Sequence, residues 1–385
     1  MTPFVPTFLD DTARAAGAAP DSRILVVVQL DGGNDGINTI VPYADEAYPR
    51  LRKELRIKSD EVLKINDRVG LHPAMRSMSQ LLEQRRLAIV QGVGYPNPNR
   101  SHFESMRIWQ TASLKPGETE PGWLAQSFDQ LPWPRAVSGP DAIYVGDADM
   151  PRALVGRRTD AAAIATADDL ALRLPIDQAG SREAPKLDAT SDDISSFVNR
   201  TVLGAYSTAH ELSRPRTATA PEVVYPQTKL ATQLQLVSRF IKSGAGTRVY
   251  YASQSGYDTH YAQLPQHEDL LRELSNAIKA FLDDLKSAGL SDRVLLMAFS
   301  EFGRRAAENG SLGTDHGSAG PVFVAGEKLN AGLIGPTPDL SDLEKGDIKV
   351  SADFRSIYGT LLKDWLSVPT TLSATLKPLP LVKSL

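Results

Sequence analysis

The chain has 385 residues, of which 42% are hydrophobic and 23% are charged, a composition typical of a globular protein that buries a core. Its 42 Lys and Arg against 46 Asp and Glu give a formal net charge of -4. This argues against a nucleic-acid partner, because nucleic-acid-binding surfaces are normally basic. Cysteine is absent, which excludes disulfides, thiolate metal ligands and cysteine nucleophiles. No apolar run approaches the ~18 residues of a membrane-spanning helix, so we expect no transmembrane segment.

The N-terminal residues 1–22 are rich in Ala, Thr, Asp and Pro and have neither a basic start nor an apolar core. No signal peptide is therefore expected in this chain. We expect a weakly ordered segment over 1–22, followed by one α/β domain over 23–385. The stretch 135–190 has the least regular pattern and is predicted to be an insertion in that domain.

Patterns of strands and helices alternate along the domain. Continuous β-branched runs such as Ile24–Leu30 are typical of strands buried on both faces, and apolar residues at helical spacing predict amphipathic helices. In chain order the predicted elements are strand 24–30, helix 73–87, strand 87–93, helix 101–111, strand 143–145, helices 192–213 and 227–243, strand 248–252, helix 263–288, strands 293–299 and 321–325, and helix 352–365. This alternation predicts an α/β fold, a three-layer α/β/α sandwich with a mainly parallel central sheet.

Acidic residues and histidines recur where these strands begin and end. In an open parallel sheet, ligands bind outside the carboxyl ends of the strands. Asp31 follows the first strand, and Glu301 follows the strand over 293–299. Asp258 and His260 follow the strand over 248–252, and His316 precedes the last strand. Carboxylate and imidazole groups are ligands suited to Zn or Mn.

Several of these residues also have a purely structural explanation. A lone Asp after a strand is usually a turn former. For Asp31, a turn-forming role and a functional role are equally favoured before its context is considered. Ser101 opens the segment Ser-His-Phe-Glu, which fits a capping box with Glu104. A helix N-terminus also attracts anions, so a cap does not exclude a catalytic role for Ser101. The remaining histidines are expected to be structural or surface residues: His72, His210 and His267. For His72, which starts a predicted helix before Pro73, a site-lining role is the alternative.

The sequence lacks the motifs of three large enzyme classes. It has no Gly-Lys dipeptide and therefore no P-loop, and its loop after Asp31 is Gly-Gly-x-x-Gly rather than the dinucleotide-binding G-x-G-x-x-G. The nucleophile elbow G-x-S-x-G of α/β-hydrolases is also missing.

Longer segments resemble a bacterial family called domain of unknown function 1501, which is grouped with the alkaline phosphatase and sulfatase superfamily. The segments are 28–36 (VQLDGGNDG), 71–73 (LHP), 94–103 (GYPNPNRSHF), 299–304 (FSEFGR) and 313–317 (GTDHG). The resemblance covers about residues 22–385 and implies an alkaline-phosphatase-like fold. Family members often carry a twin-arginine export signal, which implies a periplasmic or other extracytoplasmic location, although that signal is missing here.

The resemblance also implies roles for single residues. Asp31 matches the metal-binding Asp after the first strand, and Ser101 matches a nucleophile at a helix N-terminus. Asp258 and His260 resemble an Asp/His metal pair at altered spacing, and His316 matches a late metal-binding His.

A second carboxylate/His pair is incomplete in this sequence. Glu301 can supply its carboxylate, but Phe302 stands where the superfamily has the His. The resemblance therefore implies one or two divalent metal ions, Zn or Mn.

The resulting hypothesis is a metal-dependent hydrolase of phosphate esters, with sulfate esters less favoured because no formylglycine motif is present. Ser101 or a metal-bound water would be the nucleophile. The residues Arg100, Arg107 and Arg304 are candidates for clamping the ester oxygens. The residues expected to line the site are Asn34, His102 and Asp315.

The alternative hypothesis is an alkaline-phosphatase-like fold that has lost catalysis and acts as a binding or assembly protein, which Phe302 favours. A small-molecule or oligomeric ester is the expected substrate of the enzyme. The identity of that ester and the oligomeric state both stay open at this point.

Overall fold

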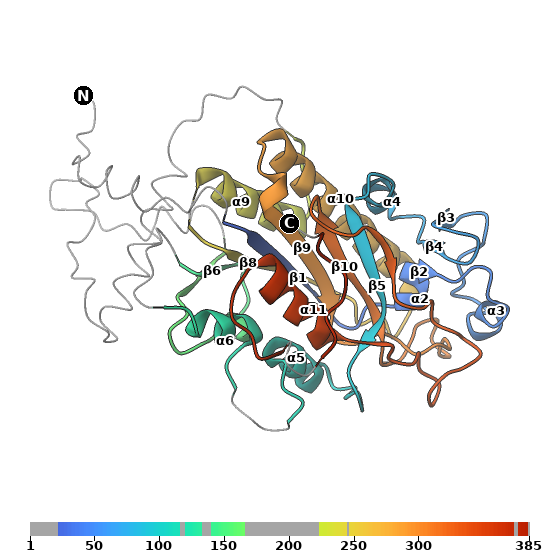
Figure 1. The fold of residues 1–385 in the computed structure, drawn as a ribbon. Helices are drawn as coiled ribbons and strands as arrows, with labels where there is room; N and C mark the ends of the chain where they lie inside the picture. Colours follow the sequence, from blue (N-terminus) through green and yellow to red (C-terminus); the bar gives the residue numbers. More distant parts are fainter. Residues whose placement is uncertain are drawn as a thin grey trace, which may run out of the picture.

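The computed structural model describes residues 22–115, 120–132, 140–165, 223–244, 246–372 and 376–383 (Figure 1). The predicted N-terminal segment up to residue 21, parts of the stretch 135–190, the predicted helix over 192–213 and His210 lie outside these residues. No helix in the described part of the chain is long and apolar enough to cross a membrane.

A mixed sheet forms the centre of the molecule. Its strands are β1 (Ile24–Asp31), β5 (Leu87–Gly94), β6 (Ala142–Val145), β7 (Ala161–Ile164), β8 (Val249–Ser255), β9 (Val294–Ser300), β10 (Gly320–Gly326), β11 (Gly332–Ile334) and β12 (Ala352–Asp353). The strand order is β11-β5-β10-β9-β1-β8-β6-β7, and β12 pairs with β5. All these pairings are parallel except those of β10 with β9 and β5. The predicted mainly parallel sheet is therefore confirmed.

Strand β1 shows why the sheet is covered on both faces. Successive side chains of a strand point to opposite faces. Val26 and Val28 belong to the apolar core on one face, and Leu25 and Val27 to the core on the other. Because both sets are fully buried, each face needs its own layer of helices.

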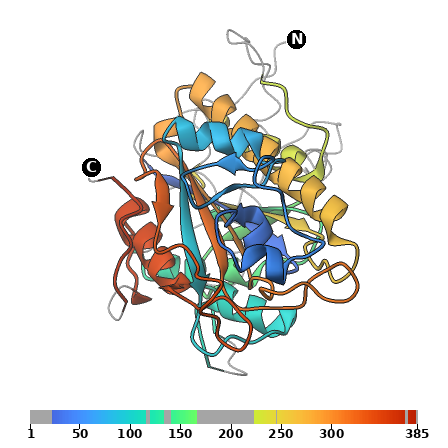
Figure 2. The same ribbon diagram turned by 90° about the vertical axis from the view of Figure 1, so that its right-hand side faces the viewer.

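Among the described residues, six main helices supply these two layers (Figures 1 and 2). The first core contains apolar residues of α4 (Arg76–Glu83), α9 (Lys229–Ser243) and α10 (Gln263–Ser287). The second contains residues of α5 (His102–Thr111), α6 (Trp123–Asp129) and α11 (Phe354–Thr360). The predicted three-layer α/β/α architecture is confirmed.

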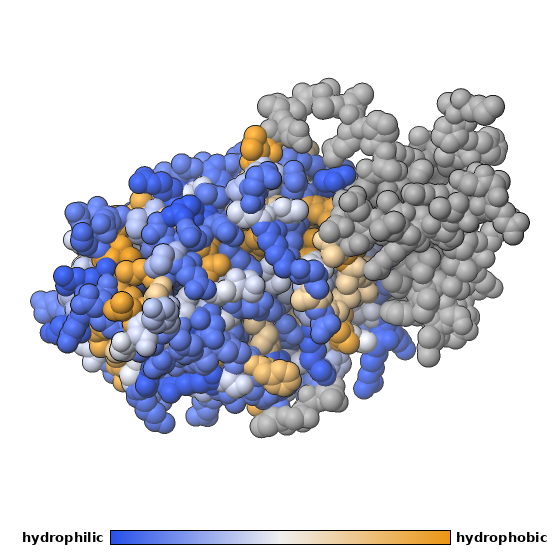
Figure 3. Space-filling model, turned by 180° about the vertical axis from the view of Figure 1, so that it is seen from behind, coloured by the Kyte–Doolittle hydropathy of each residue, from blue (hydrophilic) through white to orange (hydrophobic). Residues whose placement is uncertain are grey.

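Smaller elements complete the described structure. A three-stranded antiparallel sheet contains β2 (Ile40–Val41), β3 (Leu63–Lys64) and β4 (Gly70–Leu71), close to the short helices α2 (Gly36–Thr39) and α3 (Tyr48–Leu51). Short 3-10 helices occupy Arg152–Leu154 and Ser291–Arg293, and a π turn over Leu361–Trp365 continues α11. The face in Figure 3 is mainly hydrophilic, with scattered apolar patches.

The antiparallel direction of β10 determines where the site residues lie. Strands β8, β1 and β9 are parallel neighbours, so their carboxyl ends share one edge of the sheet. Because β10 runs the opposite way beside β9, its first residue starts at that same edge. His316, which precedes β10, is therefore brought to the edge that carries Asp31, Asp258 and Glu301.

Candidate metal centre

Three side chains from distant segments bring possible ligand atoms together at this edge. His102 begins α5, Asp258 follows β8, and His316 precedes β10. One ligand atom from each lies within 4.8 Å of the other two. The Nε2 atoms of His102 and His316 lie 3.3 and 3.1 Å from Asp258 Oδ1. Ligand atoms of a tetrahedral zinc site are about 3.3 Å apart when the bonds are about 2.0 Å long, so this spacing fits a cation.

His260 places a fourth donor beside this group. Its Nε2 lies 2.8 Å from His316 Nε2 and 3.0 Å from Asp258 Oδ1. Its other ring nitrogen, Nδ1, is 3.4 Å from Asp315 Oδ1. Asp315 therefore lies behind His260, where it can hold the orientation of the ring. We call His102, Asp258, His260 and His316 the metal cluster.

The hydrogen bonding of His102 fits a metal ligand. Its Nδ1 lies 2.7 Å from Glu301 Oε1, whereas its Nε2 is buried and has no hydrogen-bond partner among the described residues. An imidazole that donates from Nδ1 to a carboxylate presents the lone pair of Nε2, the arrangement usual for metal-binding histidines. A buried polar atom without a hydrogen bond is unfavourable. The contact of this nitrogen with Asp258 Oδ1 at 3.3 Å is an ion pair only when the ring is protonated, and a cation among the cluster atoms would satisfy the neutral ring.

The Asp-Gly-Gly segment after β1 holds Glu301 in place. The backbone N–H groups of Gly32 and Gly33 donate to the Glu301 carboxylate at 3.0 and 3.1 Å, and the Ser300 hydroxyl donates at 2.8 Å. Gly32 has a φ of +120°, and a Cβ there would lie 2.3 Å from the backbone nitrogen of Asp258. Only glycine fits this close approach. The structure therefore places Glu301 behind His102 as its hydrogen-bond partner.

Arg304 is fully buried and joins the loops that carry the cluster. Its Nη2 donates a hydrogen bond of 2.7 Å to Asp258 Oδ1. Its other hydrogen bonds go to the backbone carbonyls of Gly32, Gly33, Tyr257 and Thr314. A guanidinium bonded in this way holds Asp258 in position, and the clamp role of Arg304 stays a prediction.

The other two predicted clamp residues are also engaged. The backbone carbonyl of Arg100 accepts from His316 Nδ1 at 2.7 Å, and its side chain pairs with the buried Asp347. Arg107 pairs with Glu104 at 2.8 Å. Glu104 pairs with Arg107 and therefore does not reach back to Ser101, whose side chain makes no capping hydrogen bond. The predicted capping box is wrong.

Asp31 lies at the end of β1 and is held by a buried amide. Its Oδ1 accepts from Gln29 Nε2 at 2.5 Å, and Gln29 Oε1 in turn accepts from Gln110 and from Tyr251. Burial raises the pKa of Asp31 to about 6, and the charge of Glu301 adds to this effect. Asp31 does not belong to the close group of three ligands.

The pKa values of Asp258, His102 and His316 are shifted by their surroundings. Partial burial disfavours the ionised form of Asp258, but hydrogen bonds from Arg304 and His316 outweigh it and lower the pKa of Asp258 to about 2. The hydrogen bond with Glu301 raises the pKa of His102. Desolvation lowers the pKa of His316 and favours its neutral form. A carboxylate and a neutral imidazole are the forms that bind metals.

The remaining predicted residues are placed as follows. Ser101 is exposed and directly precedes His102 at the start of α5. Asn34 directs its Oδ1 to Thr39 and His267, each at 3.0 Å, rather than to the cluster. His267 is buried and hydrogen-bonded to Asn34. Of the two roles expected for it, structural or surface, the structural one is observed.

Sequence reasoning assigned His102 a lining role, whereas the structure makes it a candidate ligand. The sequence feature that could have indicated this role is the position of His102 directly after the predicted nucleophile at a helix N-terminus. Gln29, which contacts Asp31, and Asp347, which holds Arg100, were missed altogether. Gln29 lies in the family segment 28–36, which marks the segment but not this contact, and nothing in the sequence around Asp347 marks it as a partner of the site.

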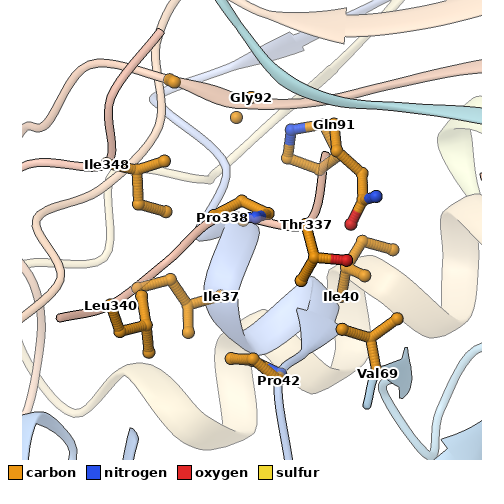
Figure 4. Close-up of a pocket in the computed structure, with 14 residues that line it drawn as sticks. Ile37, Ile40, Pro42, Val69, Gln91, Gly92, Thr337, Pro338, Leu340 and Ile348 are labelled. Carbon is orange, nitrogen blue, oxygen red and sulfur yellow. The ribbon is translucent and has the colours of Figure 1, made fainter. Parts of the chain in front are cut away.

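A separate small pocket lies between α2, β5 and residues 337–348 (Figure 4). Its walls are mostly apolar and include Ile37, Ile40, Val69, Leu340 and Ile348. Its volume of about 30 Å³ corresponds to one or two water molecules. None of the predicted site residues lines it.

Many solved structures are similar to this chain, and three of them show how low the identity is. One is the C-terminal periplasmic domain of EcEptC from Escherichia coli, with 10% identity, 91% of this chain and 84% of that chain covered, and a TM-score of 0.41. Another is a protein in the alkaline phosphatase superfamily from Vibrio parahaemolyticus, with 10% identity, coverage of 93% and 70%, and a TM-score of 0.43. The third is the lipoteichoic acid synthase LtaP from Listeria monocytogenes, with 11% identity, coverage of 89% and 80%, and a TM-score of 0.37.

Comparisons of sequence give one clear result. No curated protein matches the chain significantly. The sequence model of the family described as "Protein of unknown function (DUF1501)" matches residues 22–377. Because this match spans most of the chain, the protein belongs to that family.

Proposed function

We propose that this chain is a metal-dependent hydrolase of phosphate esters. The observation that carries the proposal is the convergence of His102, Asp258 and His316, three residues far apart in sequence whose ligand atoms lie within 4.8 Å of one another. The Nε2 of His102 is buried and lacks a hydrogen bond among the described residues. A bound cation would supply the missing interaction.

The metal cluster has the donor set for one divalent cation, Zn or Mn. When bound, such a cation supplies Lewis acidity toward an ester oxygen and lowers the pKa of a nearby hydroxyl or water. One cation is favoured over two because the Glu301 carboxylate is already occupied by His102, Ser300 and two backbone N–H groups.

The residues around the cluster have defined tasks in this proposal. Glu301 and the Arg100 carbonyl hold the Nδ1 atoms of His102 and His316, which leaves both Nε2 atoms directed at the cluster. Ser101, at the N-terminus of α5, is the proposed nucleophile, with water as the alternative. The free N–H groups and dipole of a helix N-terminus favour an anionic ester beside it.

Elemental analysis combined with activity assays tests the proposal. We expect about one equivalent of Zn or Mn and turnover of an aryl phosphate or an aryl phosphodiester, with less turnover of an aryl sulfate. His102→Ala and Asp258→Asn should lose both the metal and the turnover. Asp269→Asn, at a carboxylate on α10 that is 69% exposed, is the matched control. Wild-type metal content in His102→Ala would contradict the assigned site.

A second candidate function is a binding or assembly protein that has lost catalysis. The observation that favours it is that all three arginines expected to clamp an ester are engaged in the structure: Arg100, Arg107 and Arg304. Absence of bound metal and of turnover on all three ester classes would support this candidate over the hydrolase.

We also propose an extracytoplasmic location, which rests on the family resemblance. Fractionation of the native host with an antibody against this chain tests it. Recovery of the protein in the cytoplasmic fraction alone would contradict the proposal.

A further inference from the structure

Large apolar side chains that face solvent are few in the described part of this chain. They are Phe103, Val155, Val224, Tyr261 and Leu312. Single exposed apolar residues are common and need no explanation, but several around one polar site indicate a binding surface. Three of these side chains lie next to the metal cluster in sequence or in space.

Phe103 lies in the first turn of α5. It directly follows the candidate ligand His102 and is 83% exposed. The His102 ring itself lies inside the site, with its centroid 4.2 Å from that of His316 and 4.9 Å from that of Phe302. Phe103 therefore projects into solvent at the point where α5 enters the site.

Tyr261 and Leu312 lie on two joined loops, one of which carries His260. Tyr261 directly follows His260 and is 75% exposed, and Leu312 is 51% exposed. The N–H of Gln263 donates to the carbonyl of Leu312 at 2.8 Å, which ties the two loops together. Ala262 and Leu312 both have positive φ, at +43° and +57°. Such a conformation disfavours ordinary residues and occurs preferentially at functional sites.

We propose that Phe103, Tyr261 and Leu312, called here the apolar rim, form a subsite for an apolar group carried by the ester. The inference rests on the proposed function, because the rim borders the cluster assigned to the phosphate. The ester is then an alkyl or aryl phosphate rather than a phosphate of a fully polar alcohol. Its apolar group and the rim leave water together, which strengthens binding in proportion to the area covered.

Binding of methyl-, butyl- and octylphosphonate tests the subsite without hydrolysis. Titration calorimetry on the whole chain with Zn²⁺ supplied should show octylphosphonate binding about tenfold more tightly than butylphosphonate, a gain in line with partial burial of the added methylene groups. Phe103→Gln and Tyr261→Gln should each reduce this ratio to about twofold. Val224→Gln, at a side chain that is 87% exposed, is the matched control and should keep the full ratio.

The outcomes separate this inference from the proposed function. Equal affinities for the three phosphonates, or a ratio unchanged in both rim variants, overturn the subsite even if the chain hydrolyses esters. A chain-length dependence lost in the rim variants, without bound metal or turnover, supports the subsite and overturns the hydrolase.

The source of the ester is tested with phosphatidylcholine vesicles prepared with and without phosphatidic acid. Sedimentation with phosphatidic acid that requires the apolar rim supports the subsite and assigns it an ester presented by a membrane. Chain-length dependence without sedimentation supports the subsite and assigns it a soluble ester.

Discussion

At the scale of single residues, ionisation of the Asp31 side chain destabilises the folded chain. Its pKa of about 6 in the folded chain is above the ordinary 3.8, mainly because of burial. A carboxyl with a raised pKa loses native-state stability as the pH rises from about 4 to about 6. Asp31→Asn should therefore raise the Tm of the EDTA-treated chain at pH 8, and this gain should shrink as the pH approaches 4. Thermal unfolding at both pH values measures it, and an equal gain at both would contradict the cause.

Asp347 is a second residue with a testable role. It is buried and pairs with Arg100, whose carbonyl accepts from His316 Nδ1. The Arg100 carbonyl is the direct partner of the His316 ring, and loss of such a partner typically weakens metal binding about 10- to 100-fold. Asp347 acts on the ring only through Arg100, so the lower end of this range applies. Asp347→Asn should weaken Zn²⁺ binding in a chelator competition by about tenfold. Asp342→Asn, at an exposed carboxylate paired with Lys349, should leave the affinity unchanged.

At the scale of elements, α2 and α3 are joined by a fully buried ion pair between Asp35 and Arg52, 2.6 Å apart. Burial disfavours the Asp35 carboxylate, but Arg52 outweighs this and lowers the pKa of Asp35 to about 2. Removing one partner of a buried pair typically costs about 3–5 kcal/mol of stability. Arg52→Met should lower the free energy of unfolding in urea by about this amount. The double variant Asp35→Asn, Arg52→Met should recover part of the loss, and failure to recover would show that other contacts of Arg52 dominate.

The elements also show what the sequence can predict. Strands β1, β5 and β9 were found almost to the residue because both faces are buried and the apolar runs are continuous. The two-residue strands β2, β3 and β4 are too short to carry a period and were missed. The direction of β10 was also not predictable, because pairing direction depends on neighbours chosen in three dimensions.

The candidate site was also predictable from the sequence only in part. Asp258, His260 and His316 could be proposed because they flank predicted strands at one edge of a parallel sheet. The partners of Arg100 and Arg304 could not be predicted, because most of them are carboxylates and backbone carbonyls far away in the sequence. Arg304 is the clearest case, since a buried guanidinium and a substrate clamp have the same sequence signal.

At the scale of the whole molecule, the cluster joins segments that are far apart in the chain. A cation bound by His102, Asp258 and His316 would link α5, the loop after β8 and the loop before β10. A ligand that binds only the folded state stabilises it, by about 2.7 kcal/mol at 100 times its Kd. Zn²⁺ should therefore raise the Tm by a few degrees, on the order of 2–4 °C, and His316→Ala should abolish this shift.

The pH dependence of that shift follows from His102. The hydrogen bond with Glu301 raises the pKa of His102, and a protonated imidazole cannot bind a metal. Protons and Zn²⁺ therefore compete at this nitrogen, and the Tm shift should be full at pH 8 and decline as the pH falls toward 6. Thermal unfolding with and without Zn²⁺ at several pH values measures this decline. A Tm shift that is constant over this range, or that persists in His102→Ala, would show that the cation stabilises the chain at another place.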